Sequence, residues 1–173
     1  LNRFSPPTGG KNGHVIISTS RRVYKNGLDV LEKAFDIVKK KFPKAELRII
    51  SDAKYEDIPR YLNEADIFVR PSRSEGLGTS FLEAMAAGLP IIATSVGGIK
   101  DFLIDRETGL EVKVDDAKDL ADKIELLFTD EVLCEKLSRN GRKLVEEKYQ
   151  WSKIGKDMEK IFLEVIERSL AIS

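Results

Sequence analysis

Two glutamates and a glycine-containing turn are the residues of this chain whose types and spacing best suit chemistry. Glu75 and Glu83 flank the segment Gly76-Leu77-Gly78-Thr79-Ser80, which follows a short apolar run and leads into a helical pattern. A strand, a glycine turn and a helix N-terminus in that order bind phosphate, because glycine lets the backbone approach closely and the first helical amides point outward. Two carboxylates beside such a site predict a ligand that carries both phosphate and hydroxyl groups.

Each glutamate has two interpretations. Ser80-Phe81-Leu82-Glu83 has the spacing of a capping box, in which Glu83 would bond the backbone N–H of Ser80. Alternatively, the Glu83 carboxylate accepts hydrogen bonds from the hydroxyls of a nucleotide ribose. Glu75 precedes the turn and cannot cap this helix, so it is either a solvated loop charge or a group near a bound sugar.

Cations follow an earlier strand of the chain. Arg21, Arg22 and Lys25 come directly after the apolar run at 14–19. Beside a helix N-terminus they would hold a diphosphate, Arg through its planar fork and Lys as a point charge. The alternative is that they are solvated loop charges, as most lysines and arginines are. Weaker candidates in the later loop are Arg70 and Arg73.

Apolar periodicity predicts alternating strands and helices, which is typical of an α/β fold with a parallel sheet covered by helices on both faces. Strands are expected at 14–19, 45–50, 66–70, 89–94 and 110–114. Helices are expected at 28–42, 55–65, 80–87, 117–128 and 131–148, with a last one from Trp151. We expect Gly88 to end the central helix and Gly97-Gly98 to begin a helical turn or offer amides to an anion.

Strand composition predicts the order of the sheet. The first, third and fourth strands are continuously apolar and belong in the middle, whereas the second and fifth alternate charged with apolar residues and suit edges. Right-handed crossovers then give a Rossmann-like, doubly wound sheet of order 2-1-3-4-5. Its topological switch lies between the first and third strands, so the basic loop and the glycine turn should meet there.

Composition excludes several classes of function. Lys plus Arg equals Asp plus Glu at 29 each, so there is no basic excess for nucleic acid. The single Cys134 makes no internal disulfide, and with one histidine no metal site is readable. No apolar run approaches the ~20 residues that span a bilayer. We take His14 as structural and predict that Trp151, Met158 and Phe162 face the core.

The run RPSRSEGLGTSFLEAMAAGLPIIATSVGGIKDFL, which begins at Arg70, resembles the signature of retaining glycosyltransferases of family four. The segments TGLEVKVDD and YQWSKIG fit the same family. These are nucleotide-sugar enzymes of the GT-B fold, in which two Rossmann-like domains face each other across a cleft. The resemblance implies that this chain is the C-terminal, donor-binding half of such an enzyme.

The resemblance also implies roles for individual residues. Glu75 matches the glutamate near the donor sugar, and Glu83 matches the one at the nucleotide ribose. Gly76 to Ser80 match the turn whose amides meet the diphosphate, and Arg21 matches the arginine after the first strand. The family lysine falls at Asn26 in this chain, so its neighbour Lys25 is the expected substitute. No metal or other cofactor is expected beyond the UDP- or GDP-sugar itself.

The chain departs from the family in two places. A helix and a strand that usually follow the second strand are missing near Ser51, and the loop they carry often helps to hold the nucleotide base. The sequence leaves open whether this segment was lost naturally, removed by engineering or omitted. The N-terminal acceptor domain is also absent. By the resemblance, residues 1–13 are the linker to it, 14–150 the donor-binding domain and 151–173 the helix that crosses back.

The sequence therefore predicts the nucleotide-sugar-binding domain of a hexosyltransferase that acts on a glycan or lipid acceptor. We expect the isolated chain to be inactive. A cytoplasmic location is expected, with membrane association only through the parent enzyme. The alternative is a non-catalytic nucleotide-binding or scaffold module derived from such a domain, which the shortened segment favours and the intact glutamates disfavour.

Overall fold

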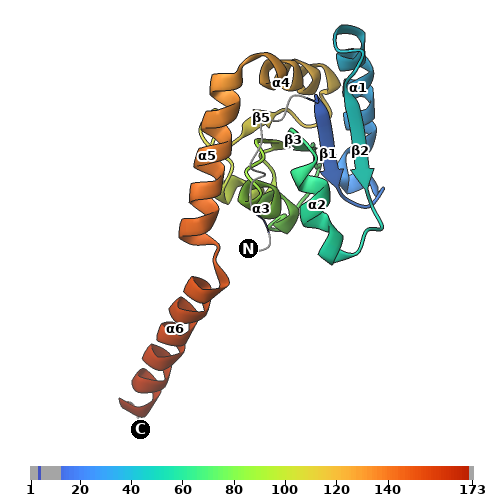
Figure 1. The fold of residues 1–173 in the computed structure, drawn as a ribbon. Coiled ribbons are helices and arrows are strands. Elements are labelled where there is room, and N and C mark those ends of the chain that lie inside the picture. The colour runs from blue at the N-terminus through green and yellow to red at the C-terminus, as the bar shows by residue number, and fades with distance from the viewer. Residues whose placement is uncertain (1–3, 5–12, 172–173) are drawn as a thin grey trace.

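A computed structural model of the chain describes residue 4 and residues 13–171, and it contains one parallel sheet (Figure 1). The strands are β1 (Val15–Thr19), β2 (Glu46–Ile50), β3 (Ile67–Arg70), β4 (Ile91–Thr94) and β5 (Leu110–Val112). They are arranged in the order β2-β1-β3-β4-β5, and every adjacent pair is parallel. The predicted topology is confirmed, including the switch point between β1 and β3.

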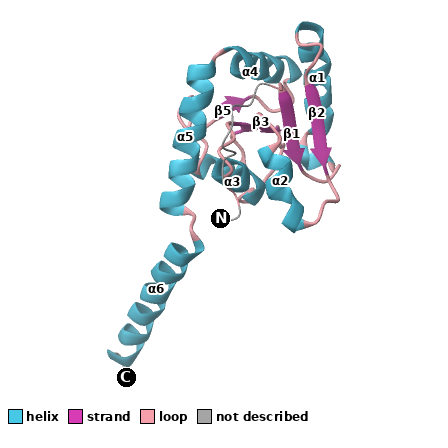
Figure 2. Cartoon of the chain, in the orientation of Figure 1, coloured by secondary structure: helices cyan, strands magenta, loops and turns pink. Residues whose placement is uncertain are grey.

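Helices cover both faces of the sheet, as predicted (Figure 2). Alternate residues of β1 point to opposite faces: Ile16 joins the core formed with α1 and α4, whereas Val15 and Ile17 join the core formed with α2 and α3. The long helix α5 contributes to both cores. The bounds of these helices are α1 (Leu28–Lys41), α2 (Ile58–Asn63), α3 (Thr79–Ala86), α4 (Ala117–Thr129) and α5 (Glu131–Lys148).

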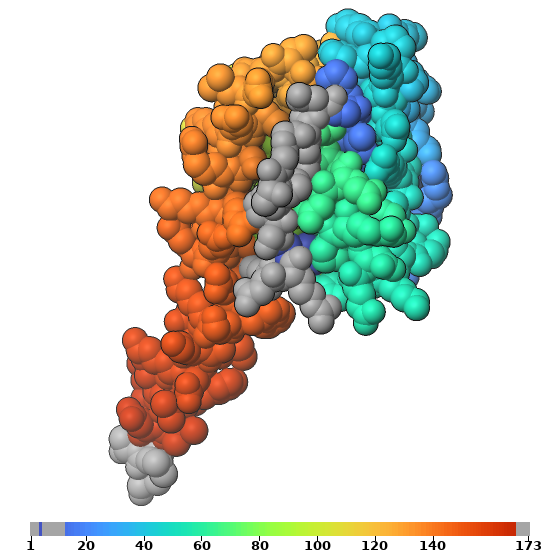
Figure 3. Space-filling view, in the orientation of Figure 1, coloured from blue at the N-terminus to red at the C-terminus, as the bar shows by residue number. Residues whose placement is uncertain are grey.

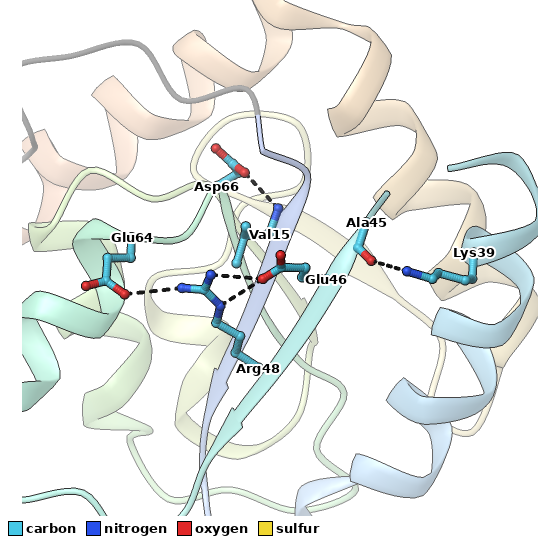
Figure 4. Close-up of polar contacts among 7 residues, drawn as sticks. All are labelled: Val15, Lys39, Ala45, Glu46, Arg48, Glu64 and Asp66. Atoms are coloured by element: carbon cyan, nitrogen blue, oxygen red, sulfur yellow. Dashed lines mark hydrogen bonds and ion pairs between the residues drawn. The ribbon is translucent and has the colours of Figure 1, made fainter. Parts of the chain in front are cut away.

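Polar contacts hold the edge strand β2 and the start of β1 (Figure 4). The Arg48 guanidinium lies 2.9 Å from Glu46 and 3.2 Å from Glu64, so the charged side chain of the edge strand reaches the end of α2. The carboxylate of Asp66 accepts from the backbone amide of Val15 at 2.7 Å, which ties the entry of β1 to that of β3. The alternating pattern of β2 is thus that of an edge strand.

Element boundaries differ slightly from the prediction. The expected helix at 55–65 is a 3₁₀ turn, η2 (Tyr55–Asp57), followed by the short α2. The strand expected at 110–114 ends at Val112, and Asp115 then adopts a left-handed conformation with φ 61°. Gly88 follows α3 with φ 73°, which confirms it as the stop of that helix. The predicted linker, apart from its residues 4 and 13, lies outside the described residues.

The last helix, α6 (Trp151–Ala171), projects away from the sheet (Figures 1 and 3). Trp151, Met158 and Phe162 are 77%, 49% and 59% exposed. The prediction that these side chains face the core is wrong, because the helix leaves the body of the domain and its apolar face meets neither core. Within the part of the chain that the structure describes, no helix is long and apolar enough to cross a membrane.

Candidate functional site

A cleft of about 610 Å³ opens at the carboxyl ends of β1, β2 and β3, on the predicted switch point of the sheet. Its volume lies in the range of small-molecule sites. Both glutamates, two cations of the first loop and most of the glycine turn reach it. The sequence-predicted residues that line it are Arg21, Lys25, Arg70, Glu75, Leu77, Gly78, Thr79, Ser80 and Glu83.

The loop between β1 and α1 presents Arg21 and Lys25 to the cleft from an exposed position. Asn26, which stands where the family lysine was expected, is buried, and its amide donates to the carbonyl oxygen of Arg21 at 2.8 Å. Asn26 therefore shapes the loop, and Lys25 beside it is the exposed cation. Arg22 instead pairs with Glu32 at 2.7 Å, away from the cleft lining.

The glycine turn is held by close backbone packing. Gly78 adopts φ 72° as the N-cap of α3, and no side chain caps this helix. A Cβ on Gly97 would lie 1.8 Å from the carbonyl oxygen of Glu75. The amide of Gly98 donates to the carbonyl oxygen of Gly76 at 2.7 Å. Gly97 and Gly98 begin η3 (Gly97–Asp101), which is the helical turn predicted there. Their backbone packs against residues 75 and 76 and so supports the glycine turn. Gly76 does not line the cleft.

The capping-box interpretation of Glu83 is wrong. Ser80 lies inside α3, whose N-cap is Gly78, and its hydroxyl accepts from Arg70 at 2.7 Å. The helix begins at Thr79, two residues earlier than that interpretation requires. Glu83 instead lines the cleft beside Tyr55, which hydrogen-bonds to it. Burial raises the pKa of Glu83, and this hydrogen bond and the charge of Arg70 oppose the rise.

Arg70 and Glu75 form a buried ion pair at the floor of the cleft. Their side chains are 8% and 14% exposed, and Nη2 of Arg70 bonds Oε2 of Glu75. The guanidinium also lies 4.6 Å from the centre of the Phe81 ring. Burial lowers the pKa of Arg70, while the charges of Glu75 and Glu83 oppose the change. The interpretation of Glu75 as a solvated loop charge is therefore wrong.

Arg73, three residues later, serves a different purpose. Its guanidinium forks onto Asp29 at 2.8 and 2.7 Å, reaches Asp115 at 2.7 Å and stacks 4.0 Å from the Tyr24 ring centre. Its backbone amide donates to the carbonyl oxygen of Lys25 at 2.8 Å. Arg73 therefore ties three loops together beside the cleft and does not line it.

Several lining residues were missed from the sequence. They are Thr19, Ser20, Val23, Asn26, Ile50, Ser51, Ala53, Tyr55 and Ile58. Most of them follow β1 or β2, so the predicted topology itself placed them at the correct edge of the sheet. What the sequence did not indicate is that Tyr55 turns back to contact Glu83, because that contact depends on how the short segment after β2 folds.

Comparison with known proteins identifies the family. Residues 50–144 match the family model of the glycosyl transferases group 1. This chain belongs to that family. It is 38% identical over 109 residues to the capsular polysaccharide biosynthesis glycosyltransferase CapM of Staphylococcus aureus. The match covers 63% of this chain and 29% of CapM, so the chain is much shorter than this relative.

Solved structures of glycosyltransferases share the fold of this group 1 domain. The C-terminal domain of the group 1 protein LpcC from Francisella tularensis is 24% identical, with a TM-score of 0.77 over 87% of this chain and 97% of that domain. The Staphylococcus aureus protein TarM, solved as a mutant with fondaparinux, α-GlcNAc-glycerol and UDP, gives a TM-score of 0.80 at 22% identity. That match covers 91% of this chain and 37% of TarM. The fold is that of the C-terminal half of a GT-B glycosyltransferase.

Proposed function

We propose that this chain is the donor-binding half of a retaining glycosyltransferase of family four. In the parent enzyme it would take a UDP- or GDP-sugar and transfer the hexose to a glycan or lipid acceptor. The observation that carries the proposal is the single cleft that brings Arg21 and Lys25 together with the N-terminus of α3 and with Glu83. The UDP in the TarM complex, a protein of the same fold, supports a nucleotide as the ligand.

The cationic side of the cleft suits a diphosphate. Arg21 and Lys25 are exposed and can approach phosphate oxygens. At the start of α3 the amides of Thr79 and Ser80 have no acceptor within the helix, whereas the amide of Phe81 donates to the carbonyl oxygen of Gly78 at 2.9 Å. During transfer, negative charge grows on the leaving diphosphate, and fixed cations and amides that face it lower the barrier. On this proposal the protein groups supply that charge and no metal ion is required.

The two carboxylates suit the two sugars of the donor. Glu83 lies in α3 beside Tyr55 and lines the cleft. There its carboxylate would accept hydrogen bonds from the ribose hydroxyls. Glu75 lies at the floor of the same cleft with its carboxylate fixed by Arg70. There it would position the transferred hexose. This division of roles is the one that the family resemblance implies, with the diphosphate at α3.

The acceptor would bind elsewhere. The proposal assigns it to an N-terminal domain outside this chain, with α6 as the helix that returns to that domain. The exposed apolar side chains of α6 support this assignment. The isolated chain would then bind a donor weakly and transfer no sugar. The proposed location is cytoplasmic, and any association with a membrane would come through the absent half.

Calorimetric titration with UDP, GDP and ADP tests the proposal directly. We expect one diphosphate to bind best and Arg21→Ala to weaken it about tenfold, because a charge-assisted phosphate contact is lost. Arg22→Ala is the matched control, since Arg22 lies in the same loop but pairs with Glu32. Binding of no nucleotide, or equal losses in both variants, would contradict the proposal.

A further inference from the structure

Arg70 is a buried charged residue that lines the cleft. The proposed function assigns it no direct contact with the donor. It ends β3, a strand whose other residues, Ile67, Phe68 and Val69, are apolar and fully buried or nearly so. The guanidinium bonds both Glu75 and Ser80 and stacks on the Phe81 ring. Taking such a charge out of water is costly, so its retention at the end of an apolar strand requires a reason.

The charge balance of the cleft lining explains why a buried guanidinium stands at the end of β3. Besides Arg70, the charged lining residues are two cations, Arg21 and Lys25, and two carboxylates, Glu75 and Glu83. Without Arg70 the carboxylates would cancel the cations. A nucleoside diphosphate would then bring further negative charge into a cleft with no net attraction for it. With Arg70 present, one positive charge remains in excess.

Arg70 also fixes the direction of the Glu75 carboxylate. Oε2 of Glu75 accepts from Nη2 of Arg70, and Oε1 accepts from the backbone amide of Gly76 at 3.0 Å. Both carboxylate oxygens therefore accept a hydrogen bond from the protein. The second arm of the guanidinium is anchored in turn by the Ser80 hydroxyl, inside the first turn of α3. The ion pair thus connects Glu75 rigidly to the helix whose N-terminus would meet the diphosphate.

We propose that Arg70 is a positioning residue for the donor: it orients Glu75 and supplies the counter-charge that lets two carboxylates stand in a diphosphate-binding cleft. This inference rests on the proposed function, because it takes a nucleoside diphosphate as the ligand. Arg70 acts through Glu75 and through the charge balance of the cleft. It needs no contact with the donor.

A series of three variants and three ligands tests the inference. Arg70→Met keeps an apolar stem over Phe81 and removes the charge, Glu75→Gln removes the carboxylate, and the double variant removes both. Uridine, UMP and UDP add negative charge one step at a time to the same nucleoside. UDP carries no hexose, so the loss of a Glu75 contact with the transferred sugar does not enter the measurement.

We expect Arg70→Met to lower the affinity for UDP by about tenfold or more, the affinity for UMP by less and that for uridine hardly at all. The reason is that the Glu75 carboxylate, left without its counter-charge, repels the phosphate groups. Glu75→Gln should bind UDP at least as tightly as the wild-type chain. The double variant should recover most of the loss, to within about threefold of wild type, because two coupled charges are removed together.

Two outcomes would overturn the inference. Equal losses for uridine and UDP in Arg70→Met would show general damage to the site, and a double variant as weak as Arg70→Met would show that Glu75 is not the group being compensated. Urea unfolding of the same variants checks the pair without any ligand. There the single Arg70→Met variant should lose more stability than the double, since it leaves a buried carboxylate unpaired.

The same experiment separates this inference from the proposed function. A wild-type chain that binds neither UMP nor UDP in this series, nor GDP in the earlier titration, would refute the donor site and, with it, the role of Arg70 toward a donor. A wild-type chain that binds UDP with an Arg70→Met variant of equal affinity would leave the donor site intact. It would refute only the role proposed for Arg70.

Discussion

The loop between β1 and α1 reaches the cleft with exposed cations, whereas the segment between β3 and α3 reaches it with groups that are held in buried contacts. Arg21 and Lys25 are exposed. Across the cleft, Glu75 is bonded through both carboxylate oxygens and its partner Arg70 is itself fixed by Ser80. We call the β1–α1 loop the adaptable wall of the cleft, because its cations are exposed. We call the segment from Arg70 to Glu83 the fixed wall, because its charged side chains are held by hydrogen bonds.

This difference between the two walls matches what the diphosphate and the hexose of the proposed ligand each require. A diphosphate is flexible and highly charged, so two solvated cations can follow it as it enters. A hexose must be held at a fixed angle for reaction, and a carboxylate locked into the β3–α3 wall meets that need. The backbone carbonyl of Glu75 and that of Gly76 are in turn supported by Gly97 and Gly98, so this wall is rigid in its main chain as well.

The largest expected effect comes from Gly27, where the backbones of the two walls approach most tightly. Gly27 has φ 67°, and a Cβ there would lie 2.0 Å from the carbonyl oxygen of Pro71. Gly27→Ala should push the walls apart and lower the free energy of unfolding by roughly 3 kcal/mol, from overpacking and left-handed strain together. Urea unfolding measures this change, and nucleotide binding should be lost along with it.

Gly76→Ala is the matched control for that prediction. A Cβ on Gly76 meets no atom within 4 Å, and Gly76 is not among the glycines with positive φ. Its free energy of unfolding should change by less than about 1 kcal/mol. If the two substitutions had equal effects, the close contact at Gly27 would not be what sets the distance between the walls.

The next effect is confined to the adaptable wall. Lys25→Ala should weaken UDP binding about tenfold while the free energy of unfolding stays within about 0.5 kcal/mol of wild type. The side chain is exposed, so little folding energy depends on it. The measurement pairs calorimetry with urea unfolding, and Lys40→Ala, an exposed lysine at the far end of α1, is the control. A large loss of stability would show that Lys25 belongs to the structural wall instead.

The fold was predictable because its signals are local. Continuous apolar runs identified the central strands, alternating charges identified β2 and β5 as edges, and right-handed crossovers left one order. The same topology placed the basic loop beside the glycine turn. Arg21, Lys25, both glutamates and the turn from Leu77 to Ser80 therefore share one cleft, whereas Gly76, Arg22 and Arg73 lie outside its lining.

What the sequence did not predict depends on partners that are distant in the chain. Arg70 and Arg73 have the same type and are three residues apart, yet one pairs with Glu75 in the cleft and the other braces Asp29 and Asp115 outside it. Helical spacing on α6 correctly predicted an apolar face. It could not say that the described part of the chain leaves that face exposed, because periodicity specifies a buried side and not its partner.

The smallest effect concerns Glu83, the second carboxylate that lines the cleft. Glu83→Gln keeps an acceptor for Tyr55 and for a ribose hydroxyl but loses the charge, so UDP affinity should fall about fivefold. Glu111→Gln, on the exposed side of β5, is the control. An unchanged affinity would remove Glu83 from the proposed ribose site.

Stability should respond in the opposite direction from affinity. Because burial raises the pKa of Glu83 in the folded chain, folding favours its protonated form, and the ionised form costs stability as pH rises through the folded pKa. Glu83→Gln should therefore be slightly more stable than wild type at pH 7. That advantage should shrink as pH falls and vanish below the ordinary pKa range of glutamate. An advantage that grew on acidification would mean that Glu83 is stabilised as an anion.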